Sequence, residues 1–99
     1  MSVNALTWHL DTCVDGAVTV GAASTLALAA NGQRANAIFI NDSDQVIYLA
    51  RGHAAVLNDG IRLNANGGSY EMMVDNMFRG AVYAICVGGQ ANLCVCEGI

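Results

Sequence analysis

The sequence predicts an all-β protein, built as an antiparallel β-sandwich or a jelly-roll-like barrel of about eight short strands. Short runs rich in β-branched and aromatic residues recur along the chain, at spacings of roughly 8–12 residues. Clusters of Gly, Asn, Asp and Ser separate these runs and must supply the turns, because the chain contains no Pro. No amphipathic run is long enough for the crossover helix of a parallel sheet, so a parallel α/β architecture is not expected.

The N-terminal segment is the least regular part of the sequence. Residues 1–16 have mixed polarity and one large side chain, Trp8, so we expect an arm or an edge strand that packs on another subunit. The Asp15-Gly16 pair predicts a turn. Residues 17–20 are mainly β-branched and predict a strand. Residues 24–29 alternate in the manner of a second strand, and a helix this short would be marginal.

Two pairs of apolar runs predict β-hairpins. Residues 35–41 and 45–51 contain the strongest strand signals, Ile-Phe-Ile and Val-Ile-Tyr-Leu, and the polar turn Asn-Asp-Ser-Asp joins them. Residues 81–87 and 92–97 form the second pair, which Gly88-Gly89 joins. The two strands of each pair are therefore expected to lie side by side in one sheet.

Three shorter runs lie between the two expected hairpins. Residues 54–57, 61–63 and 69–74 are each rich in apolar or β-forming side chains. Asn-Asp-Gly, a run from Asn64 to Gly68, and Asp75-Asn76 end these runs in order, and all three are turn-forming sequences. We therefore expect three short strands here.

Length and composition allow a single domain. The chain has 99 residues and a mass of 10.3 kDa, so residues 17–99 are expected to form one β-sandwich domain. Hydrophobic residues make up 55% and charged residues 12%, which excludes intrinsic disorder. Residues 35–41 and 81–87 are apolar on both faces, so these strands either lie centrally with cover on both sides or contact another subunit. We favour the subunit interface, because a small domain offers little second-layer cover.

Charge excludes several functional classes. The net charge is −4, Lys is absent, and the four Arg residues are spread singly, so no nucleic-acid partner is expected. A chain without Lys has neither Schiff-base chemistry nor a P-loop lysine. The longest apolar-looking run, residues 21–30, is too short to span a membrane and lacks the basic segment that precedes a signal-peptide core.

Cysteine, histidine and acidic side chains are the candidates for a metal or catalytic site. Cys94 and Cys96 would lie on the same face of a strand, as a soft metal requires, but no standard ligand spacing completes the set. A hairpin at Gly88-Gly89 would place Cys86 opposite Ala91 and Cys94 opposite Tyr83, so these cysteines are not expected to be cross-strand partners. Without a secretory signal, we expect reduced, buried thiols that pack as small hydrophobes. His9, Asp11 and Cys13 share a parity but lack the cleft and oxyanion donors of a nucleophilic site. We expect no metal, no cofactor and no enzyme activity; the alternative is a small metal or redox protein.

Several segments, taken in their order along the chain, resemble those of a known family. These segments are Arg34, Ala37–Ile40, Asn41–Asp44, Ile47–Leu49, Gly60–Leu63, Gly67–Glu71, Gly80–Ile85 and Val95–Gly98. In this order they resemble small β-structured accessory virion proteins of tailed bacteriophages, over about two-thirds of the chain. The N-terminal third lies outside the resemblance.

The resemblance implies a capsid decoration or cement protein that binds the assembled head and stabilises it. It implies the major capsid protein as partner, a homotrimer, and a place on the capsid surface of a virion made in the host bacterial cytoplasm. The alternative is a receptor- or sugar-binding module of a phage fibre or tail. Large aromatic and Arg side chains are the expected interface anchors, and an intramolecular role is the alternative for each. These candidates are Trp8, Tyr48, Arg51, Arg62, Phe78, Arg79 and Tyr83.

Overall fold

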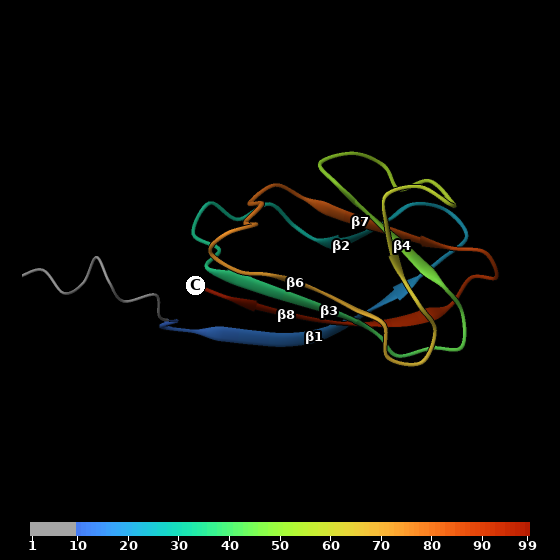
Figure 1. Ribbon diagram of the computed structural model, residues 1–99, viewed down its shortest axis with the longest axis horizontal. Helices are drawn as coiled ribbons and strands as arrows, with labels where there is room; N and C mark the ends of the chain where they lie inside the picture. Colours follow the sequence, from blue (N-terminus) through green and yellow to red (C-terminus); the bar gives the residue numbers. More distant parts are fainter. Residues whose placement is uncertain (1–9) are drawn as a thin grey trace, which may run out of the picture.

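The computed structural model describes residues 10–99, which form an all-β fold (Figure 1). Its strands are β1 (Cys13–Val20), β2 (Thr25–Leu28), β3 (Asn36–Asn41), β4 (Ile47–Arg51), β5 (Ile61–Leu63), β6 (Ser69–Met72), β7 (Val82–Cys86) and β8 (Ala91–Gly98). No helix in this part of the chain is long and apolar enough to cross a membrane. Trp8 and His9 lie outside the described residues.

The strands form two four-stranded antiparallel sheets that pack against each other (Figure 1). The first sheet has the order β1-β8-β3-β6, and the second has the order β2-β7-β4-β5. Every connection passes from one sheet to the other, except the one between β4 and β5. This is the strand order of a double-sheet jelly roll, so the all-β sandwich predicted from the sequence is confirmed.

Both predicted hairpins are wrong, although their strands are present. β3 and β8 lie in the first sheet, whereas β4 and β7 lie in the second. The buried Asn41 side chain donates through Nδ2 to three carbonyl oxygens, those of Gln45 (2.6 Å), Leu63 (3.1 Å) and Asn64 (3.2 Å). These bonds turn the end of β3 towards the second sheet. The Gln45 side chain accepts from the Gly88 N–H at 2.7 Å and so holds the β7–β8 connection at the same end.

Two local predictions are also corrected. Asp15 and Gly16 lie inside β1 rather than in a turn, because β8 offers a pairing partner along the whole strand, from Cys13 opposite Gly98 onwards. The segment expected as an arm or edge strand thus contributes residues 13–16 to an edge strand. Residues 54–57 form no strand and belong to the connection between β4 and β5.

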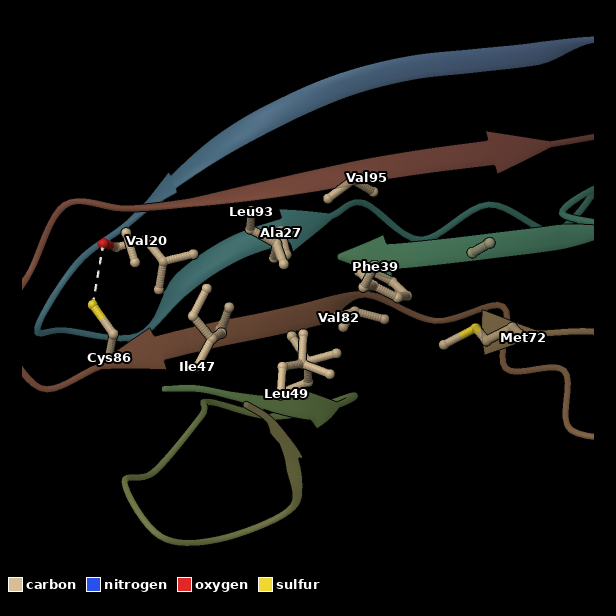
Figure 2. Close-up of a cluster of buried hydrophobic side chains, with 14 residues drawn as sticks. Val20, Ala27, Phe39, Ile47, Leu49, Met72, Val82, Cys86, Leu93 and Val95 are labelled. Atoms are coloured by element: carbon tan, nitrogen blue, oxygen red, sulfur yellow. Dashed lines mark hydrogen bonds between the residues drawn. The ribbon is translucent and has the colours of Figure 1, made fainter. Parts of the chain in front are cut away.

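The core lies between the inner faces of the two sheets (Figure 2). Alternate residues of the facing strands supply it, as the two-residue period of a strand requires. The Cys86 thiol donates to the Val20 carbonyl oxygen at 3.4 Å, so this cysteine is both apolar filler and a link between the sheets. Other buried members include Phe39, Ile47, Leu49, Met72, Val82 and Leu93.

A fully buried guanidinium closes one end of the core. Arg34 has no exposed side-chain surface, and its Nε donates to the Glu97 carboxylate at 2.7 Å. Its terminal nitrogens donate to three carbonyl oxygens, those of Ala29 (2.7 Å), Phe78 (2.5 Å) and Gly80 (3.0 Å). Arg34 therefore links three segments: the residue Ala29 just after β2, the stretch from Phe78 to Gly80 before β7, and Glu97 in β8.

The outer face of the second sheet is covered by the chain itself. The connection between β4 and β5, residues 52–60, is called the covering loop, and it arches over this sheet in yellow-green (Figure 1). Ala55 packs in a small buried cluster with Tyr48, Ala50 and Ile85, and its N–H donates to Ser24 Oγ at 2.9 Å. β7 is thus a central strand whose outer face the chain itself partly covers, which is one of the two explanations for the apolar character of residues 81–87 on both faces.

Candidate functional site

The outer face of the first sheet differs from that of the second, because within residues 10–99 no segment packs over it as the covering loop does (Figure 1). Its side chains come from all four strands and follow the alternation opposite to the core. We name this surface the thiol face, after the cysteines on it. It comprises Cys13, Asp15, Ala17, Ile38, Ile40, Ser69, Glu71, Cys94 and Cys96.

The strand register arranges the thiol face in rows. Asp15, Cys96, Ile38 and Glu71 form one row across β1, β8, β3 and β6. Ala17, Cys94, Ile40 and Ser69 form the next. Each row thus has a thiol and an Ile in the middle, and the first has a carboxylate at either end. The result is an apolar strip with an acidic rim, on which Ile40 is 37% exposed.

The expectation that the cysteines are buried core thiols holds only for Cys86. Cys13 is exposed and Cys94 and Cys96 are half-buried, and all four are free thiols. The strand parity explains the difference, because Cys94 and Cys96 alternate with the core residues of β8. The predicted partners are also wrong, since Cys86 lies opposite Ile47 in β4 and Cys94 lies between β1 and β3.

Burial raises the pKa of the Cys96 thiol above its usual range, and a hydrogen bond and the negative charge of Asp15 raise it further. Cys94 and Cys13 add smaller contributions in the same direction. The thiol of Cys96 is therefore held in its protonated form, which is the less nucleophilic one. Among residues 10–99, no group of three His, Cys, Asp or Glu side chains is arranged to hold a metal ion.

Three of the predicted interface residues meet on the second sheet. Tyr48 is nearly buried beneath the covering loop, where its hydroxyl donates to Asn58 Oδ1 at 3.0 Å. Arg62 lies opposite Tyr48, places its guanidinium 6.0 Å from the ring centroid and donates to the hydroxyl at 3.3 Å. Tyr83 is partly buried against the same cluster. These contacts are intramolecular, and Arg62 is the exposed member of the group.

The remaining predicted interface residues lie apart from that group. Phe78 packs against the main core, and Arg79 donates through Nε to the Arg34 carbonyl oxygen at 3.0 Å. Both therefore support the end of the sandwich that Arg34 closes. Arg51 is exposed at the end of β4. The structure does not bring the predicted residues into one surface, and Trp8 lies outside the described residues.

Two adjoining hollows lie where the covering loop leaves β4 and returns to β5. They measure about 260 and 280 Å³ and share Ala50, His53 and Gly60 as lining residues. Asp59 lines the first and Arg51 the second, so the hollows carry polar and charged groups over an apolar floor. Of these residues, only Arg51 was predicted from the sequence as an interface candidate.

The sequence did not predict that the residues of the thiol face lie together. Strand parity within β3 and β8 was visible in the sequence, but the order of strands was not, and that order brings Ile38 beside Cys96.

Comparisons with known proteins give no further assignment: no family model, no curated protein and no solved structure matches the chain.

Proposed function

We propose that the protein is a structural accessory protein of a tailed-bacteriophage virion, a decoration or cement protein that binds the assembled head. It catalyses no reaction and uses no cofactor; its work is done by surfaces. The major capsid protein is its proposed partner, and the capsid surface is its proposed place. The resemblance of the segments from Arg34 to Gly98 suggests this class, and jelly rolls are common among capsid proteins.

The observation that carries the proposal is the contrast between the two outer faces. A nine-residue loop, residues 52–60, covers the outer face of the second sheet. The thiol face has an apolar strip that no such loop covers in the described residues. An uncovered apolar strip with a polar rim is the composition of a protein interface. The acidic groups at its ends, Asp15 and Glu71, suit a partner surface that is apolar in its centre and basic around it.

Such a surface would stabilise a capsid by mass action. A protein that binds the assembled shell and not the free subunits shifts the equilibrium towards the shell. Many copies on one particle add up their modest single contributions, because each bound copy favours the assembled shell. A protein of 10.3 kDa therefore needs only one surface that binds the capsid to fulfil this role.

The test is a sedimentation assay with heads of the encoding phage assembled without this protein. We expect the wild-type chain to sediment with the heads and to raise their temperature of disruption. Ile40→Lys, on the thiol face, should abolish binding, because an ammonium group would be desolvated in an apolar contact. Val56→Lys is the matched control, since Val56 is 55% exposed on the covering loop of the opposite face.

Circular dichroism would first establish that both variants are folded. Absence of wild-type binding to heads would overturn the proposal. Loss of binding in Val56→Lys with retention in Ile40→Lys would overturn the assignment of the thiol face as the contact surface.

A receptor- or sugar-binding module of a fibre or tail is the second candidate. The hollows beside His53 favour it, because jelly rolls also serve as lectins and polar groups over an apolar floor suit a sugar ring. A glycan array probed with the wild-type chain and with His53→Ala tests it. Binding that the substitution removes would support this candidate, and an array without any bound glycan would overturn it.

A further inference from the structure

The free edge of the first sheet is unusually open. β1 is eight residues long, and within residues 10–99 it pairs only with β8 (Figure 1). Residues 13–17 and Thr19 are all exposed. Proteins usually block such an edge with Lys, Pro, a bulge or a covering segment. β1 contains neither Lys nor Pro, and its register with β8 is unbroken from Cys13 to Val20.

The hydrogen bonds at the start of β1 show which backbone groups face outwards. Thr12 and Ile99 exchange both bonds, with N–H to oxygen pairs at 3.1 and 2.8 Å. In an antiparallel pair such mutual bonds recur at every second residue, so the even-numbered residues of β1 bond to β8. The N–H and C=O groups of the odd-numbered residues point to the free edge. These residues are Cys13, Asp15, Ala17 and Thr19.

We propose that β1 pairs with β1 of a second copy of this chain, antiparallel, across a two-fold axis at Gly16. The two first sheets then form one continuous eight-stranded sheet. Asp15 lies opposite Ala17 of the second copy, and Cys13 lies opposite Thr19. A two-fold contact of this kind uses the same surface on both copies, so it closes at a dimer. All eight outward backbone groups on each copy gain a partner.

The register follows from parity and charge. Only odd-numbered residues offer outward groups, so odd must face odd, which leaves shifts of two residues as the alternatives. One shift places Asp15 opposite Asp15 of the second copy, and directly opposed like charges destabilise a sheet. The other places Cys13 opposite Gly21, beyond the end of β1, and moves Val14 opposite Val20, which is already fully buried.

Burial of Val14 favours the same register. Val14 is 66% exposed although its side chain lies on the core side of the first sheet. It lines an open, mainly apolar hollow of about 180 Å³ together with Val18, Leu28 and Val95. Pairing about Gly16 places Val14 beside Val18 of the second copy at both ends of the contact. An exposed apolar side chain is thereby covered twice in each dimer.

This inference goes beyond the proposed function and does not rest on it. A dimer without head binding would overturn only the virion role, and head binding by a monomer would overturn only the dimer. The two-fold pair also differs from the trimer expected from the sequence, and the native mass distinguishes them.

The first test is the native mass by light scattering after size exclusion in reducing buffer. We expect twice the chain mass of 10.3 kDa. Ala17→Pro should give a folded monomer, because it removes an N–H that points outwards and not one that bonds to β8. Ala17→Val is the control, since it keeps the N–H, and should remain dimeric. A wild-type monomer or trimer, or an Ala17→Pro dimer, would overturn the proposal.

The second test fixes the register by cross-linking. The three cysteines of the thiol face are first replaced by Ser, which leaves the buried Cys86. Gly16→Cys then places two thiols across the two-fold axis, in a pair without mutual hydrogen bonds and with Cα atoms about 4.5 Å apart. A side chain fits there, because an added Cβ meets no atom within 4 Å. Mild oxidation should yield a disulfide-linked dimer.

Val14→Cys in the same background is the control, because its partner would be Val18 and not itself. Equal or stronger cross-linking of Val14→Cys would overturn this register. A charge exchange tests it in solution: Ala17→Asp should weaken the dimer about tenfold by opposing Asp15, since two such pairs form. Adding Asp15→Lys should restore it, and failure to restore would contradict the pairing of these two positions.

Discussion

At the scale of single residues, Arg34 shows how far a side chain can depart from its sequence context. A lone Arg among polar residues suggests a solvated charge, yet Arg34 is fully buried against Glu97 and three backbone carbonyls. Three of the four partners, at Phe78, Gly80 and Glu97, lie in segments remote from Arg34 in the sequence, so no local pattern could reveal them. Arg34 therefore has a structural role in this chain, where it links segments of both sheets.

Replacement of Arg34 should be among the most damaging changes in the protein. Arg34→Met leaves the Glu97 carboxylate and three carbonyl oxygens without their donor, and removal of one partner of a buried pair costs about 3–5 kcal/mol. Urea unfolding followed by circular dichroism measures the loss. Arg51→Met, at an exposed Arg, is the control and should change the free energy of unfolding by less than about 0.5 kcal/mol. Equal effects would contradict the bracing role of Arg34.

The reactivity of the Cys96 thiol should depend on the carboxylate of Asp15, which helps to raise its pKa. Its raised pKa means that the folded protein holds this proton more tightly than the unfolded chain does. The stability from this group is therefore complete below the ordinary thiol pKa of about 8.5 and is lost as the pH rises through the folded value. Asp15→Asn removes a negative charge and should speed alkylation of Cys96 several-fold at pH 8.

Mass spectrometry of the iodoacetamide adducts measures this rate for each cysteine separately. Asp44→Asn is the control, because Asp44 is an exposed carboxylate in the β3–β4 turn. An alkylation rate at Cys96 that Asp15→Asn leaves unchanged would show that burial alone sets the pKa.

At the scale of elements, the covering loop depends on one glycine where it returns to β5. Gly60 has a φ of 82°, and an added Cβ would collide with the Leu49 carbonyl oxygen. Gly60→Ala should therefore cost at least about 2 kcal/mol, from left-handed strain and the displaced strand. Gly32→Ala is the control, since a Cβ there meets nothing within 4 Å and φ is not positive. Thermal unfolding measures both, and similar midpoints would contradict this role of Gly60.

Strand positions could be predicted from the sequence far better than strand partners. The run from Ala35 to Asn41 became β3 (Asn36–Asn41) almost unchanged, because its β-branched and aromatic residues fit a pleated surface wherever it lies. Its partners β6 and β8 are distant in sequence, and the turn after Asn41 only indicates that the chain changes direction. The sheet that the chain enters next is set by hydrogen bonds from Asn41 to carbonyls as far along the chain as Asn64. Such bonds leave no signal in a local window.

The same limit applied to the candidate site. Whether Tyr48, Tyr83 and Phe78 are exposed or buried depends on what packs over them, and the sequence predicts a strand at residues 54–57, where the structure has the covering loop. With that loop in place, Tyr48 is buried and contacts Asn58 and Arg62 of its own chain. The apolar parity of β3 was visible, but its exposure on the thiol face follows only from the sheet order.

At the scale of the whole molecule, the jelly-roll connections make the two sheets one folding unit. Successive strands alternate between the sheets except at β4 and β5, and the inner faces of the two sheets share a single core cluster. Because the chain passes back and forth between the sheets, neither sheet can form all of its strand pairs before most of the other sheet is in place. The covering loop adds a second small cluster to one side, so the two outer faces differ while the core between them is common. The two outer surfaces of the molecule thus differ, but we expect the two sheets to unfold together as one cooperative unit.

Native-state hydrogen exchange should detect this unity. β8 and β7 are central strands of different sheets, so their amides should exchange only through global unfolding, with the same free energy as urea unfolding gives. Edge strand β1 should exchange through smaller openings at lower free energy, and more slowly at concentrations at which the dimer forms. A free energy for β7 well below that of β8 would mean that the second sheet opens alone. The connections that cross between the sheets would then not couple them, contrary to the single core described here.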